Sequence, residues 1–214
     1  MRNRPADDAN VPVEAFLFDM GDVLIKFSHA RMFAQVAAVI GRPPEEVQRL
    51  FVETGLFVGY DRGDLTDEEF VMRVERCAAT PVERRELMHA VADIFEPSPG
   101  MFEVLTELKR RGYRMVLLSN TCRPHIEFVR ERFPIYGLLD DYALSFEVHA
   151  VKPEPAIFRA AIAKAGVPPE RCFYTDDIPA YVEAGREMGL QAEVFTGVVD
   201  LKRQLSARGI ELPE

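Results

Sequence analysis

The stretch FLFDMGDVL, residues 16–24, decides the fold. Its apolar beginning has the length and composition of a short buried strand. The strand stops at a carboxylate, Asp19, and Gly21 follows two residues later without a carboxylate of its own. Asp19 is therefore expected at the carboxyl end of a strand, which is the edge where open α/β sheets place their ligands.

The chain beyond residue 97 alternates between helical patterns and short apolar segments. Four helical stretches close on a glycine, which favours the left-handed conformation of a helix C-cap. Ile157, Phe158 and Ala161 recur on one face of such a helix. Strands are expected over residues 14–18, 113–119, 141–145, 171–175 and 190–195. This alternation predicts an α/β fold, with a Rossmann-like parallel sheet that has helices on both faces.

Residues 28–96 interrupt the alternation, because helical patterns follow one another there without a convincing strand. Four helices are expected, over 29–40, 44–54, 67–79 and 82–94. Thr66 and Glu69 have the spacing of a capping box at the start of the third helix. The predicted domains are an α/β core of residues 13–27 and 97–214, an inserted all-helical cap of residues 28–96, and a polar N-terminal tail of residues 1–12.

Composition argues against several classes of partner. The 214 residues carry 26 Lys and Arg against 35 Asp and Glu, and the net charge of -9 disfavours nucleic acid and anionic lipid. No segment reaches the ~20 apolar residues of a membrane span, and no signal peptide is recognisable. A cytoplasmic protein is expected, with Cys77, Cys122 and Cys172 as reduced thiols that match no metal-ligand spacing. The oligomeric state is not indicated.

Polar side chains gather where the predicted strands end. Each alone is typical of an ordinary turn or surface position, but the order of the strands places them at one edge of the sheet. In chain order they are Asp19, Ser119, Asn120, Lys152, Asp176 and Asp177. Three carboxylates in one pocket would raise one another's pKa unless a cation intervened. Carboxylate and carbonyl oxygens suit Mg²⁺, which is the predicted cofactor.

This ordered set resembles the haloacid dehalogenase-like hydrolase superfamily, in the branch with a helical cap after the first strand. The resemblance covers about residues 13–200 and includes the stretches YDRGDLTDEEF and RCFYTDDIPAYVEAGREMGL. It implies a Mg²⁺-dependent phosphatase that acts on a small phosphorylated metabolite, with sugar phosphates as one class. In such an enzyme a carboxylate attacks phosphorus and forms an aspartyl-phosphate.

The resemblance also implies a role for each residue of the set. Asp19 is the nucleophile, and Lys152 neutralises charge. Ser119 and Asn120 hold phosphoryl oxygens. The metal ligands are Asp19, the carbonyl of Gly21 and Asp176, with Asp177 in or near the metal shell.

The sequence departs from the family pattern at Gly21, where phosphatases of the family usually have the aspartate that protonates the leaving group. Asp22 is a weak substitute, because a one-residue offset normally turns a side chain the other way. His149 has a suitable pKa for an acid or base but is more typical of a loop residue. Tyr181 stands where the family often has Asn.

Substrate contacts are expected from the cap. The candidates are Phe51, Phe57, Tyr60 and Arg62, with a surface role favoured for His29. Aromatic residues at helical spacing are more often part of a core, so the substrate itself is not predicted.

Two other functions are compatible with Gly21. A metal-free 2-haloacid dehalogenase needs a nucleophilic aspartate but no acid, although the pair Asp176 and Asp177 argues against it. A catalytically weak phospholigand-binding protein could retain the fold after losing the acid. If the protein is a phosphatase, we expect it to prefer phosphates of comparatively acidic hydroxyls, such as anomeric, aryl or acyl phosphates.

Overall fold

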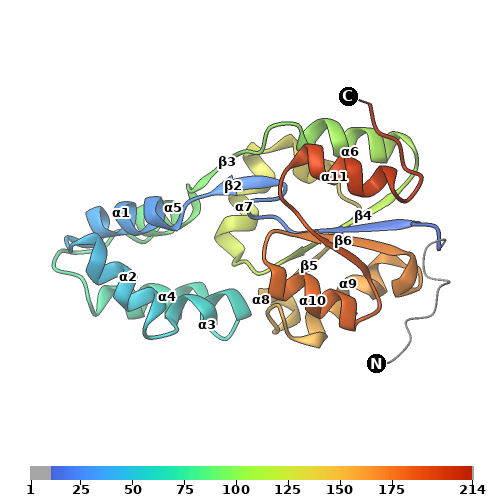
Figure 1. Cartoon of the computed structure of the whole chain (residues 1–214). Coiled ribbons are helices and arrows are strands. Elements are labelled where there is room, and N and C mark those ends of the chain that lie inside the picture. Colours follow the sequence, from blue (N-terminus) through green and yellow to red (C-terminus); the bar gives the residue numbers. More distant parts are fainter. Residues whose placement is uncertain (1–10, 214) are drawn as a thin grey trace.

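The computed structural model describes residues 11–213 (Figure 1). The predicted N-terminal tail, residues 1–12, lies almost wholly outside these residues. Within the described range, no helix has the length and apolar character needed to cross a membrane.

The centre of the molecule is a parallel sheet of five strands in the order β5-β4-β1-β6-β7. The strands are β1 (Ala15–Phe18), β4 (Arg114–Ser119), β5 (Asp141–Leu144), β6 (Cys172–Asp176) and β7 (Gln191–Val194). All five lie within one or two residues of the predicted strands, so the predicted α/β fold is confirmed. Phe18 pairs with Leu117 on one side and with Thr175 on the other, so three strands end side by side.

Helices cover both faces of this sheet, as Figure 1 shows. On one face lie α6 (Met101–Arg110) and α11 (Val198–Ser206), and on the other α9 (Pro155–Ala165) and α10 (Pro179–Glu187). Phe16 and Phe18 of β1 belong to the core cluster on the α6 side, whereas Leu17 belongs to the cluster around α9. Because successive strand residues point to opposite faces, a strand that is buried on both faces reads as a continuous apolar run.

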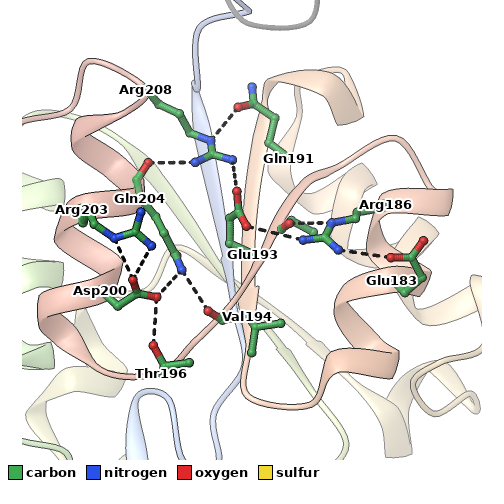
Figure 2. A network of polar contacts seen from close by, with 11 residues as sticks. Glu183, Arg186, Gln191, Glu193, Val194, Thr196, Asp200, Arg203, Gln204 and Arg208 are labelled. Carbon is green, nitrogen blue, oxygen red and sulfur yellow. Dashed lines mark hydrogen bonds and ion pairs between the residues drawn. The ribbon is translucent and has the colours of Figure 1, made fainter. Parts of the chain in front are cut away.

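The edge strand β7 is tied to its neighbouring helices by charged and polar side chains (Figure 2). Arg208 donates to Glu193 at 2.8 Å and to Gln191 at 3.1 Å, and Arg186 donates to the carbonyl of Ala192 at 3.0 Å. Charged side chains beside an edge strand discourage pairing with another chain. This network is therefore structural and lies apart from the polar residues at the strand ends.

Residues 28–96 hold five helices, where four were expected. They are α1 (His29–Ile40), α2 (Pro44–Val52), α3 (Leu56–Arg62), α4 (Asp67–Glu75) and α5 (Arg84–Ala92). The unexpected helix α3 has only seven residues, with left-handed Gly55 and Gly63 at its ends. Glycines at that density hide a helix in the sequence pattern. The capping box of Thr66 and Glu69 is confirmed by hydrogen bonds of 3.2 and 2.8 Å.

A small second sheet lies where the chain leaves the core and returns to it. The strands β2 (Ile25–Phe27) and β3 (Phe95–Pro97) pair antiparallel, with Phe27 opposite Phe95. This pairing was not expected from the sequence. The division into a core of residues 13–27 and 97–214 and a cap of residues 28–96 stays a prediction, and the two strands lie close to both of its boundaries.

Helix α3, in the segment predicted as the cap and called the cap below, contacts α8 (Ser145–Val148) in the predicted core. The Ser145 hydroxyl donates to the carbonyl of Asp61 at 2.5 Å, and Arg62 forms an ion pair with Glu154 at 2.6 Å. Gly63 approaches so closely that an added Cβ would lie 2.3 Å from the carbonyl oxygen of Phe146. These contacts hold the end of the cap beside the carboxyl edge of the sheet.

Candidate active site

A buried lysine joins two of the predicted carboxylates. Lys152 Nζ lies 2.6 Å from Asp19 Oδ1 and 2.6 Å from Asp176 Oδ2, and the lysine side chain is 1% exposed. Burial alone would lower the pKa of Lys152, but the two carboxylates raise it above its usual value, so the ammonium stays charged. Burial raises the pKa of Asp19 to about 7 against the opposing effect of Lys152. The single positive charge of Lys152 therefore offsets only part of the negative charge of the two buried carboxylates.

Asn120 fixes the backbone of Lys152. Its Oδ1 accepts from the N–H of Lys152 at 2.7 Å, and its Nδ2 donates to the carbonyl of Lys152 at 3.2 Å. Both ends of the amide are therefore engaged with the lysine, which favours a positioning role over the predicted direct hold on phosphoryl oxygens. Ser119 and Asn120 both lie in the wall of the adjoining cavity.

The three predicted acids differ in what they contact, although their carboxylate oxygens lie within 4.8 Å of one another. Asp176 is fully buried, where it accepts from the N–H of Ile178 at 2.9 Å and from the hydroxyl of Tyr174 at 2.5 Å besides Lys152. Asp177 lines the cavity, and burial together with Asp176 raises its pKa. All three carboxylates offer the oxygen ligands of a hard divalent cation, but those of Asp176 already accept three hydrogen bonds.

The cavity has a volume of about 280 Å³ and lies between the edge of the sheet and the cap. We call its polar side the carboxylate end, formed by Asp19, Gly21, Ser119, Asn120, Lys152 and Asp177. We call a second group of lining residues the aromatic end: Phe27, His29, Phe57, Val58, Asp61, Ile94, Phe95 and His125. The cavity therefore combines a site for an anion with an apolar wall that carries three polar side chains.

The place of a side chain at position 21 is filled by another residue. A Cβ added to Gly21 would lie 2.7 Å from Cε1 and 2.9 Å from Cδ1 of Phe27. The Phe27 ring is itself packed edge-on against His29, with 4.8 Å between the ring centroids. The acid expected at this position is thus absent, and an apolar ring occupies its space.

Neither predicted substitute for that acid lies in the wall of the cavity. Asp22 forms an ion pair with Lys26 at 3.3 Å, and its backbone is left-handed with a φ of 55°. His149 is an exposed residue at the left-handed C-cap of α8. Tyr181 does contribute to the cavity, where its ring centroid lies 5.1 Å from Lys152 Nζ and favours the ammonium by a cation–π contact.

The cap residues divide between the cavity and the cap's own core. Phe57 lines the cavity, whereas Phe51 is buried against it at 5.8 Å between ring centroids. Tyr60 stacks on Phe70 at 4.2 Å. His29, for which a surface role was favoured, lies in the cavity wall.

Sequence reasoning missed Phe27, Asp61 and His125 in the wall of the cavity. Asp61 belongs to the stretch YDRGDLTDEEF that carries part of the family resemblance, which was the available signal. His125 follows the strand-end pair of Ser119 and Asn120 by five residues, but a lone histidine at the start of a helix has no distinctive pattern.

Comparison with known proteins agrees with this geometry. A model of the haloacid dehalogenase-like hydrolases matches residues 13–189. Protein CbbY of Cereibacter sphaeroides is 28% identical over 200 residues, which cover 86% of this chain and 85% of that protein. D-ribitol-5-phosphate phosphatase of Bacteroides thetaiotaomicron is 24% identical over 204 residues, which cover 91% of this chain and 97% of that enzyme.

A solved structure with similar architecture contains ligands. It is a HAD family enzyme of Bacteroides thetaiotaomicron in complex with magnesium and inorganic phosphate. Its TM-score is 0.75 at 25% identity, and the match covers 86% of this chain and 93% of that chain.

Proposed function

The chain belongs to the haloacid dehalogenase-like hydrolases, and we propose that it is a Mg²⁺-dependent phosphomonoesterase for a small phosphorylated metabolite, with Asp19 as the nucleophile. The observation that carries the proposal is the buried contact of Lys152 with Asp19 and Asp176, each at 2.6 Å, in the wall of a cavity of metabolite size. The relatives named as phosphatases and the magnesium and phosphate complex of a similar structure support it.

The residues at the carboxylate end divide the work of phosphoryl transfer. An Asp19 oxygen forms a bond to phosphorus as the bond from phosphorus to the leaving oxygen breaks, which gives an aspartyl-phosphate. Lys152 balances the charge of the incoming phosphate, and Asn120 and Asp176 hold Lys152 in place. Water then attacks phosphorus and releases phosphate and the Asp19 carboxylate.

A bound Mg²⁺ would supply positive charge to the phosphoryl oxygens during both transfers. The residues that would hold it are Asp19, Asp177 and the carbonyl of Gly21. In this proposal Asp176 acts chiefly on Lys152, because Ile178, Tyr174 and Lys152 already donate to its two oxygens. The sequence-based prediction made Asp176 a metal ligand and placed Asp177 in or near the metal shell. The proposal instead makes Asp177 the ligand and gives Asp176 the role of holding Lys152.

Proton transfer to the leaving group is the weak point of this site. A positioned general acid typically contributes ~10²–10⁴ in rate. The Phe27 ring occupies the space of a side chain at position 21, and Asp22 and His149 lie outside the cavity wall. The preferred substrates are therefore phosphates whose leaving groups need little protonation, such as anomeric sugar phosphates, aryl phosphates or acyl phosphates.

The aromatic end is suited to a compact ring. Phe27, Phe57 and Phe95 provide apolar surface for the face of a sugar or an aryl group. His29, Asp61 and His125 add polar atoms that hydroxyl groups of a sugar could contact. We propose sugar phosphates as the first class to test.

One alternative has a specific observation in its favour. The filled acid position at Gly21 and Phe27 also fits a protein that binds phosphorylated ligands and turns them over poorly. A metal-free dehalogenase is disfavoured because Asp177 would then stand beside Asp19 and Asp176 with Lys152 as the nearby cation.

The experiment is a phosphate-release screen over sugar, aryl and acyl phosphates, with Mg²⁺ or with a chelator, and with Asp19→Asn as the blank. Release that needs both Mg²⁺ and Asp19 is the expected result. Binding of a phosphorylated ligand without release above the Asp19→Asn blank would favour the binding protein. Halide release from a 2-haloacid in the presence of chelator would favour the dehalogenase.

A further inference from the structure

A second cluster of possible metal ligands lies at the aromatic end and joins the cap to the core. Asp61 comes from α3 of the cap, and Cys122 is the N-cap residue of α7 (Arg123–Arg132) in the core. His125 lies in the first turn of α7. One ligand atom from each of the three side chains lies within 4.8 Å of the other two.

One ring nitrogen of His125 is engaged by the backbone, and the other is available to a metal. Its Nε2 lies 3.1 Å from the carbonyl oxygen of Val91 and donates to it, so Nδ1 carries the free lone pair. A backbone carbonyl that accepts from the second ring nitrogen is the usual support of a ligating histidine. Phe57 and Phe95 pack against the ring at 5.9 and 5.2 Å between centroids and fix its plane.

The other two groups lack a compensating charge. Asp61 Oδ1 is buried and has no hydrogen-bond partner among the described residues. Burial raises the pKa of Asp61 to about 7, against a smaller opposing effect of a hydrogen bond with the Cys122 thiol. Cys122 is 0% exposed, and burial raises the pKa of its thiol. At the carboxylate end, the positive charge of Lys152 offsets the negative charge of the acids. Here, by contrast, no positively charged or hydrogen-bonding group among the described residues contacts Asp61 Oδ1.

We propose that Asp61, Cys122 and His125 bind a thiophilic divalent cation such as Zn²⁺. Sulfur, imidazole nitrogen and carboxylate oxygen are the ligands of zinc in proteins, whereas Mg²⁺ selects oxygen alone. Asp61 and His125 also line the cavity, so a water or a ligand there can complete a tetrahedral shell. Binding releases the thiol proton of Cys122 to solvent, together with that of Asp61 when it is protonated.

The site links α3 of the cap to α7 of the core at the aromatic end. A cation there ties these helices together and occupies space that the leaving group of a substrate would need. Zinc is therefore expected to inhibit turnover in the presence of saturating Mg²⁺. Cation binding itself depends on neither Asp19 nor Mg²⁺, so it is measurable whether or not the protein is a phosphatase.

The test uses Co²⁺ as a spectroscopic substitute for zinc, with the full chain and excess Mg²⁺ to occupy the all-oxygen site. The background variant is Cys77→Ser, because Cys77 is exposed. One equivalent of Co²⁺ should produce thiolate-to-cobalt charge-transfer absorption, which an all-oxygen site cannot give. Zn²⁺ should abolish this absorption by displacement.

Three variants locate the ligands. Cys122→Ser should remove the charge-transfer absorption, and serine is itself a good N-cap residue, so α7 should persist. The matched control Cys172→Ser changes another buried cysteine and should keep the absorption. Asp61→Asn should weaken Co²⁺ binding by about tenfold or more, because it removes an anionic ligand.

Two results would overturn the proposal. One is the lack of thiolate absorption at stoichiometric Co²⁺ in the background variant. The other is equal Co²⁺ affinity in the background and in Asp61→Asn, with both folded by circular dichroism. The comparison with Asp61→Asn tests the proposal even if Cys122→Ser fails to fold.

Discussion

The two ends of the cavity differ in how their buried polar groups are paired. At the carboxylate end, Lys152 lies 2.6 Å from each of two acids, and Asn120 holds its backbone. At the aromatic end, a Phe27 ring fills the space beside Gly21, and one buried oxygen of Asp61 has no hydrogen-bond partner within residues 11–213. The protein therefore retains the groups for attack on phosphorus but has no acidic side chain at position 21, next to Asp19.

The largest expected effect comes from the nucleophile. Asp19→Asn should lower phosphate release by at least about 10³, because a carboxamide is nearly isosteric but a poor nucleophile. The measurement is kcat/KM on the best substrate of the screen, with thermal unfolding as the control for the fold. Activity above roughly a tenth of that of the unmodified protein would contradict the role of Asp19.

The next effect separates the two neighbouring acids. Asp177→Ala should raise the Mg²⁺ concentration for half-maximal activity by about 10–100-fold, since it removes a ligand that faces the cavity. Asp176→Ala should chiefly destabilise the fold, because it leaves Lys152 and the Tyr174 hydroxyl without a buried acceptor. Mg²⁺ titrations and thermal melts of both variants measure this. An unchanged Mg²⁺ requirement in Asp177→Ala would refute the ligand assignment.

A third prediction restores the missing acid. Gly21→Asp alone should gain little on an alkyl phosphate, because the new side chain meets Phe27 at 2.7 Å from its Cβ. Gly21→Asp combined with Phe27→Ala should gain about tenfold or more over the matched control Phe27→Ala. Steady-state rates on one alkyl and one aryl phosphate are compared, and the alkyl substrate should gain more. An equal gain on both substrates would contradict a role in leaving-group protonation.

The smallest predicted effect is on stability and concerns Asp61. Its pKa is raised by burial to about 7 in the fold, so the folded state favours the protonated carboxyl. That contribution is fully present near pH 4 and is lost as the pH rises through 7. Asp61→Asn should therefore gain stability relative to the unmodified protein between pH 4 and 8, by about 1 kcal/mol.

Urea unfolding at several pH values in the presence of chelator measures this difference. The matched control is Asp64→Asn, which changes an exposed carboxylate two residues beyond α3. A difference between Asp61→Asn and the unmodified protein that is constant with pH would show that Asp61 titrates normally.

The sequence was most informative where chemistry and local pattern coincide. The strands β4, β6 and β7 were predictable because each is a short apolar run that follows a helix closing on glycine, and β1 and β5 were predictable as short apolar segments. Asp19, Ser119 and Asp177 lie at or just after strand ends, and parallel strands end at one edge, whereas Lys152 lies in the loop between α8 and α9. Helix α3 was missed because its glycines obscure the helical pattern.

The aromatic end was not predictable in the same way. Phe27, Asp61 and His125 meet only because the paired strands β2 and β3 and the contact of α3 with α8 bring the cap beside the core. Such proximity depends on tertiary packing rather than on spacing along the chain. For the same reason Cys122, which matches no metal motif in the sequence, lies next to two other possible ligands in the structure.

The most direct test of the central claim is the dependence of kcat/KM on the pKa of the leaving group, measured with a series of aryl and alkyl phosphates of similar size. This constant reports the attack of Asp19 on phosphorus even where hydrolysis of the aspartyl-phosphate limits kcat. Without a general acid, which typically contributes about 10²–10⁴ in rate, kcat/KM should fall steeply from acidic phenols to simple alcohols. Rates that do not change with the leaving group would contradict it, because another group would then be donating the proton.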